Sequence, residues 1–118
     1  MAKFRFEDLQ IWQEACRIGD ELDSIADALE NKGKRRYAEQ LRAAALSVSN
    51  NIAEGSGSTS NKDFKNFLNI ARRSVSENAN MVHFLRRKMA LTSEISDRLL
   101  DELHVLSAKI TSFARSLE

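Results

Sequence analysis

Apolar residues recur at helical spacing along four long stretches of the chain, and short polar segments separate these stretches. The first stretch alternates spacings of four and three, which is typical of a helix that buries one face in a bundle. Its apolar positions are Ile11, Ala15, Ile18, Leu22, Ile25 and Leu29. We therefore predict helices at about residues 7–30, 34–54, 62–88 and 93–117, within a single domain that spans residues 1–118.

The second stretch, from Gln40 to Gly57, consists mainly of small side chains and ends in glycines. A helix this thin lets its neighbours approach closely. Its main apolar face comprises Leu41, Ala44, Ala45, Val48 and Ile52, and a second, smaller face comprises Leu46, Asn50 and Ala53. We expect neighbouring helices to cover both faces.

The third stretch carries two apolar stripes about 100° apart. The core stripe comprises Phe64, Leu68, Ala71, Val75, Val82, Leu85 and Met89. The second stripe comprises Phe67, Ile70, Met81 and Phe84, with Ser74 and Glu77 between the two. Large side chains left in water would form an exposed apolar patch, so the second stripe indicates a subunit interface. The alternative is a single, very wide core face.

Helix ends are marked by local signals. Gly33 suits the left-handed conformation that ends a helix. Ser60 and Asp63, three residues apart, resemble a capping box that opens the third helix. Thr92 or Ser93 is the expected N-cap of the fourth helix. The core stripe of the fourth helix comprises Ile95, Leu99, Leu103, Leu106, Ile110, Phe113 and Leu117.

Composition favours an all-α fold, because the 118 residues include no proline and only four glycines. Four helices with short connections most simply form an antiparallel up-and-down bundle. No apolar run approaches the roughly 20 residues that cross a bilayer, and the N-terminus has no hydrophobic signal core, so we expect a cytoplasmic protein without membrane contact. Cys16 is expected in the core, and Trp12 at the bundle edge or in a subunit contact.

The net charge of +1 hides a strong polarity along the chain. Residues 7–30 hold eight acids and one base, whereas residues 62–88 hold seven bases and two acids. An antiparallel bundle would bring two basic segments to one end. The candidate nucleic-acid contacts are Lys34, Arg35, Arg36, Lys65, Arg72, Arg86, Arg87 and Lys88.

The helix dipole divides these cations. Arg86, Arg87 and Lys88 suit a helix C-terminus, whereas Lys34, Arg35 and Arg36 would stand at an N-terminus, where the dipole opposes them. Either ion pairing with acids of this chain or another subunit, or a phosphate-bearing partner, would account for the second group. Tyr37 is the one aromatic residue near the basic cluster, which gives base stacking little support.

No pattern indicates catalysis, a cofactor, a metal or a small-molecule substrate. His83 and His104 lie on different predicted helices, and no HxxxH or CxxC spacing is present. Glu54 and Glu77 have no histidine or thiol beside them in the sequence. The glycines after Glu54 match no phosphate-binding loop.

Several motifs together resemble the family of four-helix-bundle proteins encoded in intervening sequences of bacterial 23S rRNA genes. The similarity rests on FEDL with IWQ at residues 6–13, QLRAA at 40–44, NIAEG at 51–55, and DF with FLNIA at 63–71, followed by Ser74 and Glu77. It covers nearly the whole chain. Asn78 departs from the usual pattern, in which leucine often follows the glutamate.

This resemblance implies an antiparallel bundle that assembles into a homo-oligomeric ring of five subunits. It also implies kinship with the accessory proteins of diversity-generating retroelements, which bind nucleic acid and a nucleic-acid enzyme. We expect Asn51 and Glu54 to hydrogen-bond an adjoining turn or subunit, and Glu77 to meet an arginine of a neighbouring subunit. The predicted interface comprises Trp12, Asn51, Glu54, Phe67, Ile70, Glu77, Met81 and Phe84.

Two functions are compatible with the sequence. The first is a non-enzymatic oligomeric scaffold that binds structured RNA through its basic surface. The second is a protein–protein interaction module without nucleic-acid binding, whose charges serve ring assembly. Salt dependence separates the two, because binding to RNA phosphates weakens steeply as salt rises.

Overall fold

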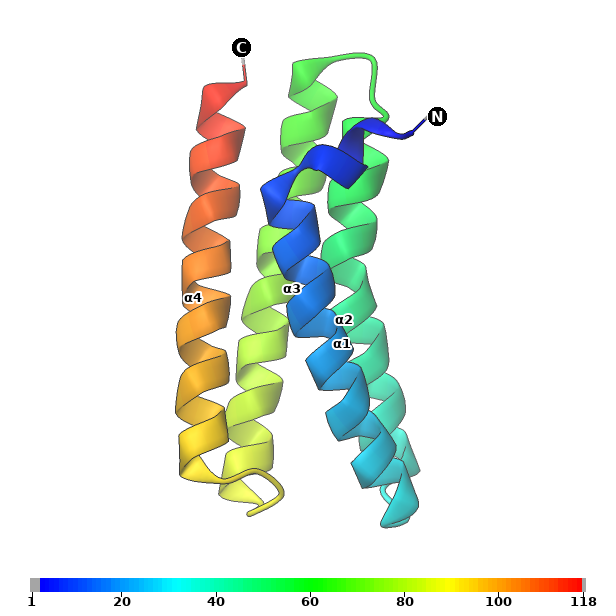
Figure 1. Ribbon diagram of the computed structural model, residues 1–118, viewed down its shortest axis with the longest axis vertical. Coiled ribbons are helices and arrows are strands. Elements are labelled where there is room, and N and C mark those ends of the chain that lie inside the picture. The colour runs from blue at the N-terminus through cyan, green and yellow to red at the C-terminus, as the bar shows by residue number, and fades with distance from the viewer. Residues whose placement is uncertain (1–2, 118) are drawn as a thin grey trace.

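The computed structural model describes residues 3–117, and over this range the chain forms helices and no strand. A short 3-10 helix, η1 (Arg5–Asp8), precedes four long helices, which are α1 (Gln10–Asn31), α2 (Arg35–Ser56), α3 (Asn61–Arg87) and α4 (Ser93–Ser116). The predicted all-α class with four long helices is confirmed, and the observed helices lie close to the predicted ranges (Figure 1).

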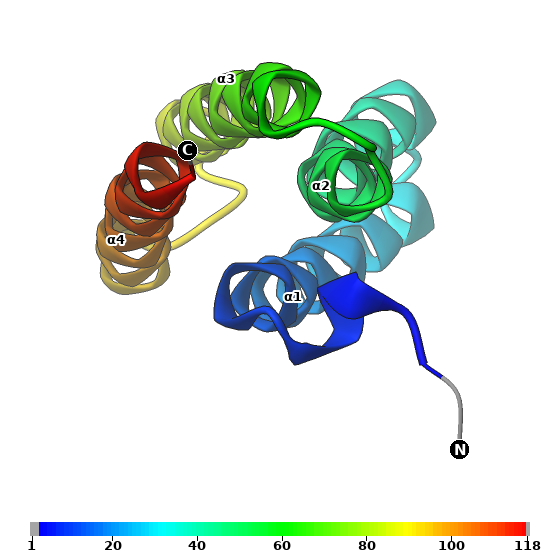
Figure 2. The same cartoon turned by 90° about the horizontal axis from the view of Figure 1, so that it is seen from above.

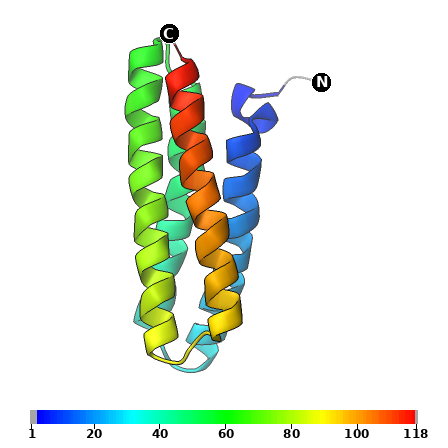
Figure 3. The ribbon, with the colours of Figure 1, turned by 90° about the vertical axis from the view of Figure 1, so that its left-hand side faces the viewer.

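The helices run lengthwise through a molecule of 45 × 27 × 22 Å (Figures 1 and 3). The α1–α2 and α3–α4 connections lie at one end of the molecule (Figure 1). We call it the basic end, because residues 34–36 and 86–88, which adjoin these connections, are all Lys or Arg. The α2–α3 connection lies at the other end, beside both ends of the described chain. Viewed along the helices, α1 to α4 follow one another around the bundle (Figure 2), and α1 and α4 make fewer contacts than the consecutive pairs.

The core consists of the predicted stripes of all four helices. Burial of each large apolar side chain contributes about 1.5–3 kcal/mol relative to exposure, so this core is the main source of stability. Its largest fully buried apolar members are Phe64, Leu22, Leu41, Ile52, Leu68, Leu99, Leu103, Leu106, Ile110 and Val82.

Three helix-end signals act as predicted. Gly33 has φ of 80° and ends the first helix by turning the chain in the left-handed conformation just after α1. Ser60 Oγ accepts a hydrogen bond from the Asp63 backbone N–H at 3.1 Å, and Thr92 Oγ1 accepts one from Ile95 at 3.2 Å. Each capping bond satisfies a backbone donor that the helix itself leaves free.

The start of the first helix differs from the prediction. Glu7 lies in η1, and Leu9 is extended, so α1 begins only at Gln10. The Phe6 ring packs edge-on against Trp12 with 4.9 Å between centroids, which folds η1 back onto α1. This contact accounts for the break before the helix and places Trp12 half-buried at the bundle edge.

Several predicted core positions are wrong at helix ends. Met89 is 91% exposed with φ of 59°, because α3 ends at Arg87 and the chain turns away from the core. In α4, Ile95 is 37% exposed and its neighbour Ser96 is buried instead. Ser96 is accommodated because its hydroxyl donates to the Thr92 carbonyl at 2.8 Å.

The second face of α2 is also wrong as predicted, because no helix covers all of it. Leu46 is 59% exposed and Asn50 is exposed, while Ala53 is half-buried. α2 packs against α1 and α3, and these two neighbours meet its main face rather than this one. In α1, Ile25 is half-buried and Ala26 takes the fully buried position.

Gly55 explains why the end of α2 must be thin. A Cβ atom at this position would lie 2.7 Å from the Phe67 Cβ and 2.8 Å from the Phe64 ring. Contacts this short do not occur, so any side chain here would push α3 away from α2. The glycine of the NIAEG segment therefore serves helix packing.

Candidate nucleic-acid interface

The basic side chains form two groups, those in ion pairs and those without a carboxylate within 4.0 Å among residues 3–117. The paired group comprises Lys3, Arg17, Arg35, Arg42, Arg86, Arg98 and Lys109. Among the predicted nucleic-acid contacts, only Arg35 and Arg86 are paired with a carboxylate within residues 3–117. The other predicted contacts have no carboxylate partner in this range, so their charge is available to a ligand.

The α1–α4 seam, where these two helices face each other, is bridged by ion pairs. Arg17 Nη1 lies 2.6 Å from Glu102 Oε1, and Lys109 Nζ lies 2.8 Å from Glu14 Oε1. Arg98 pairs with Glu21 across the seam and with Glu102 on its own helix. The hydrogen bond from Arg17 is the main cause that lowers the pKa of Glu102. These cations serve the fold.

Arg42 neutralises the acidic end of α1. Its guanidinium hydrogen-bonds Asp23 at 3.2 Å, Glu30 at 2.7 Å and also Asp27. The bonds to Asp27 and Glu30 raise the pKa of Arg42. One arginine of α2 thus occupies three carboxylates that would otherwise be available to the basic end.

The cations at the start of α2 therefore find little ion pairing within the chain. Arg35 lies 3.9 Å from Glu39 on the same helix. Lys34 and Arg36 have no carboxylate within 4.0 Å among the described residues. Pairing with the acidic end of α1 was one predicted explanation for this group, and the structure gives that role to Arg42 instead.

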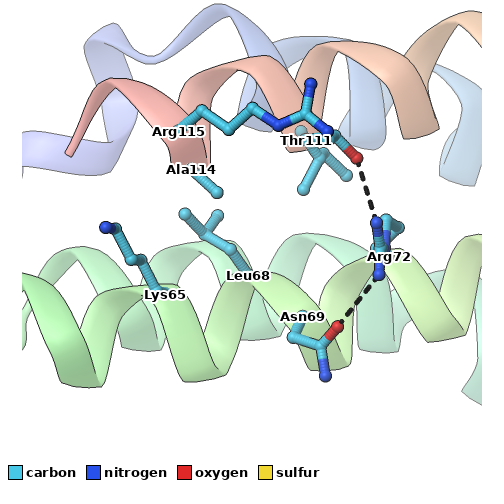
Figure 4. Close-up of a pocket in the computed structure, with 8 residues that line it drawn as sticks. Lys65, Leu68, Asn69, Arg72, Thr111, Ala114 and Arg115 are labelled. Carbon is cyan, nitrogen blue, oxygen red and sulfur yellow. Dashed lines mark hydrogen bonds between the residues drawn. The ribbon is translucent and has the colours of Figure 1, made fainter.

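A cationic groove of about 320 Å³ runs between α3 and α4 (Figure 4). Lys65 and Arg72 of α3 line one side, and Arg115 of α4 lines the other. All three side chains are exposed, and none has a carboxylate partner among residues 3–117. The apolar floor comprises Leu68, Ile110 and Ala114.

Arg72 is held across this groove by neutral partners. Its Nη1 donates to Thr111 Oγ1 and its Nη2 donates to Asn69 Oδ1, both at 3.3 Å (Figure 4). Neither partner neutralises the guanidinium charge. Guanidinium groups match phosphate oxygens in a two-point geometry, so the cationic groove is suited to an anionic ligand.

The structure separates the eight predicted contacts into two sites. Lys65 and Arg72 lie in the cationic groove, and the helical rise places Arg72 about 21 Å from Arg86. Arg115 was not among the predicted contacts. A single arginine near the chain end gives no signal in the sequence, and only the packing of α4 beside α3 brings it to Lys65 and Arg72.

The other six predicted contacts lie at the basic end. Arg86 is paired with Asp97 at 2.9 Å. Arg87 and Lys88 lie over the Phe84 ring, 5.9 and 5.8 Å from its centroid. The Tyr37 and Phe84 rings are 5.2 Å apart, so the first turn of α2 adjoins the last turns of α3. The remaining members of this group are Lys34, Arg35 and Arg36.

The second apolar stripe of α3 is largely covered by α2. Phe67, Met81 and Phe84 are half-buried, and only Ile70, at 41% exposure, lies open. Three members of this stripe thus contact the bundle in part, and the subunit interface stays a prediction.

The polar members of the predicted interface, Asn51, Glu54 and Glu77, lie on α2 and α3. Asn51 Nδ2 donates to the Ser47 carbonyl at 2.8 Å, and the Ser47 and Ser74 hydroxyls are 2.8 Å apart. Asn51 thus bonds within its own helix, while Ser47 joins α2 to α3. Glu54 and Glu77 are exposed.

Other features bear on chemistry. Cys16 is half-buried rather than fully in the core, and burial is the main cause that raises the pKa of its thiol. His83 is exposed. Within residues 3–117, no cluster of three or more His, Cys, Asp or Glu side chains is placed to hold a metal ion. No helix in this range is both long and apolar enough to cross a membrane.

The fold and this surface define the class as a small all-α protein of four long helices with an unneutralised cationic groove. Residues 7–112 match the sequence model of the 23S rRNA-intervening sequence protein family. The chain therefore belongs to that family, as the sequence motifs predicted. A search of curated proteins gives no match.

Proposed function

We propose that this protein is a non-enzymatic scaffold that binds structured RNA through the phosphate backbone, with the cationic groove as its main contact. The observation that carries the proposal is the groove itself, which Lys65, Arg72 and Arg115 line without a neutralising carboxylate among the described residues. Elsewhere the fold supplies acids to cations that bridge helices, as it does for Arg42. The link of the family to 23S rRNA intervening sequences supports RNA as the polyanion.

Assembly is part of this proposal. We propose an antiparallel up-and-down bundle that forms a homo-oligomeric ring of five subunits in the cytoplasm, related to the accessory proteins of diversity-generating retroelements. A ring would present the cationic groove several times, and linked sites gain affinity through effective concentration. The exposed Ile70 and Glu77 on the α2–α3 side support a contact there. Glu77→Ala is then expected to lower the oligomer mass measured by light scattering.

Salt dependence tests the RNA proposal. Three phosphate contacts on a duplex give a log–log slope near −2.7, which is about a fortyfold loss of affinity between 50 and 200 mM salt. The measurement is fluorescence anisotropy of a labelled RNA hairpin over a salt series. Absence of binding at 50 mM salt would leave the protein-interaction module as the function.

Two adjacent arginines of α3 provide a matched pair of variants. Arg72 and Arg73 are both exposed and neither has a carboxylate partner among residues 3–117, but only Arg72 lines the cationic groove. We expect Arg72→Ala to weaken RNA binding about tenfold at low salt and to reduce the slope by about 1. Arg73→Ala should change both much less. Equal effects of the two variants would refute the groove as the binding site.

A further inference from the structure

A second pocket, of about 250 Å³, lies at the basic end between the start of α2 and the end of α3. Its lining includes Tyr37, Gln40, Asn80, Met81, Phe84 and Arg87 and no carboxylate. We call it the aromatic pocket. Unlike the cationic groove, it combines an aromatic pair, two amides and cations.

The aromatic pair gives this pocket a stacking surface. The Tyr37 and Phe84 rings are tilted by 58° with centroids 5.2 Å apart, and Tyr37 remains 39% exposed. Arg87 and Lys88 lie over the Phe84 ring, so Tyr37 is the aromatic side chain left open to a ligand. Aromatic side chains of this kind stack unpaired bases in single-stranded segments.

The two amides give the pocket hydrogen-bonding capacity. Gln40 and Asn80 are exposed, one on each side of the pocket, and neither bonds another residue among those described. Each amide offers both donors and an acceptor, as the edge of a nucleobase does. The nearby Arg87 and Lys88 carry positive charges without carboxylate partners in residues 3–117, which suits the flanking phosphates.

We propose that the aromatic pocket binds one unpaired nucleobase of a single-stranded RNA segment. The base stacks on Tyr37, the amides of Gln40 and Asn80 hydrogen-bond its edge, and Arg87 and Lys88 contact adjacent phosphates. This inference rests on the proposed function, because it names the part of a structured RNA that the basic end contacts. Stacking has little support from the sequence alone, since Phe84 comes beside Tyr37 only in the fold.

A second copy of this chain is the competing occupant, because Met81 and Phe84 also belong to the predicted subunit interface. The acidic α1 of a second copy is a poor partner for this cationic rim, because its acids between residues 7 and 30 are ion-paired within their own chain, except Glu7 and Asp20. Glu54 and Glu77 of a second copy have no cation within 4.0 Å among residues 3–117, so the oligomer mass of the pocket variants is needed to separate the two occupants. An RNA strand brings a negative charge with every nucleotide.

The test uses two RNAs with the same stem, one blunt and one with a short single-stranded adenosine tail. The tail contribution is the ratio of their affinities at one salt concentration. We expect Tyr37→Leu to reduce this ratio about tenfold and Tyr37→Phe to preserve it, because stacking needs the ring and not the hydroxyl. Phe4→Leu is the matched control, since Phe4 is an exposed aromatic residue remote in sequence from the pocket.

A fluorescent adenine analogue in the tail provides a direct readout, because stacking on an aromatic ring quenches its emission. We expect quenching with the wild type and with Tyr37→Phe, and not with Tyr37→Leu. An unchanged tail contribution in Tyr37→Leu would overturn the inference. A fall in oligomer mass for that variant would also overturn it and assign the pocket to a subunit contact.

The proposed function and this inference fail in different ways. Loss of blunt-stem binding in Arg72→Ala, together with an unchanged tail contribution in Tyr37→Leu, would support the cationic groove and refute the aromatic pocket. A tail contribution that depends on Tyr37, without any binding of the blunt stem, would support the pocket and refute the groove.

Discussion

The two sides of α4 use cations in opposite ways. Toward α1, Arg98 and Lys109 meet carboxylates and close the weakest helix contact of the bundle. Toward α3, Arg115 lines the cationic groove opposite Lys65 and Arg72 and meets no acid among residues 3–117. Like charges gathered without neutralisation repel each other and do not stabilise a fold, so the second arrangement is more readily explained by a ligand.

The largest expected effect comes from removing the whole cationic groove. The triple variant Lys65→Ala, Arg72→Ala and Arg115→Ala should weaken RNA binding on the order of a hundredfold at 0.1 M salt, because three phosphate contacts are lost. Its free energy of unfolding should change by less than about 0.5 kcal/mol per site, because all three positions are exposed, none is ion-paired, and the two hydrogen bonds of Arg72 are long and open to solvent. Anisotropy and urea unfolding measure the two quantities. A large loss of stability would mean that these cations serve the fold after all.

The opposite result is expected at the α1–α4 seam. Lys109→Ala leaves the Glu14 carboxylate, whose side chain is 25% exposed, without its partner. We expect a loss of about 1–2 kcal/mol in the free energy of unfolding, less than for a fully buried pair, and unchanged RNA affinity. The double variant Glu14→Gln with Lys109→Met is the control, because it removes both charges and should recover part of the loss.

The core offers a variant that changes stability alone. Asn78 is 1% exposed, and its Oδ1 has no hydrogen-bond partner among the described residues. Asn78→Leu replaces this unsatisfied amide with an apolar group of the same branched shape and should raise the free energy of unfolding by about 1 kcal/mol, or about 4 °C in melting temperature. RNA affinity should not change. Thermal unfolding followed by circular dichroism measures the shift, and a lower melting temperature would show that the asparagine is satisfied in solution.

The smallest effect concerns pH. The hydrogen bond from Arg17, followed by that from Arg98, lowers the pKa of Glu102 below its ordinary 4.5. A lowered folded-state pKa stabilises the protein above about pH 4.5, and this contribution is lost as the pH falls through the folded value. Glu102→Gln should therefore flatten the acid limb of stability against pH by a few tenths of a kcal/mol. Urea unfolding at pH 7 and pH 3 measures how much stability each protein loses between the two pH values. An equal loss for the wild type and Glu102→Gln would contradict this prediction.

Local signals predicted most of the fold. The alternation of three and four placed the helices and their core faces, and Gly33, Ser60 and Thr92 marked their ends. The errors lie where a helix stops or lacks a neighbour, as at Met89 and Leu46. Periodicity alone does not show either condition.

The candidate site was harder to predict because ion pairing depends on neighbours across helix seams. The sequence identified Lys65 and Arg72 as candidates but not Arg115. It did not show that Phe84 lies against Tyr37, because these two residues come together only when α2 packs beside α3.

The sequence by itself determined the family, the number of helices and the faces they bury, because motif, period and capping are all written in neighbouring residues. Only the tertiary structure decided which charges are neutralised. Arg42 meets three carboxylates and Arg72 meets none among residues 3–117, although both are arginines within long helices. The difference arises from what each helix packs against, since electrostatic neutralisation requires proximity in space rather than in sequence.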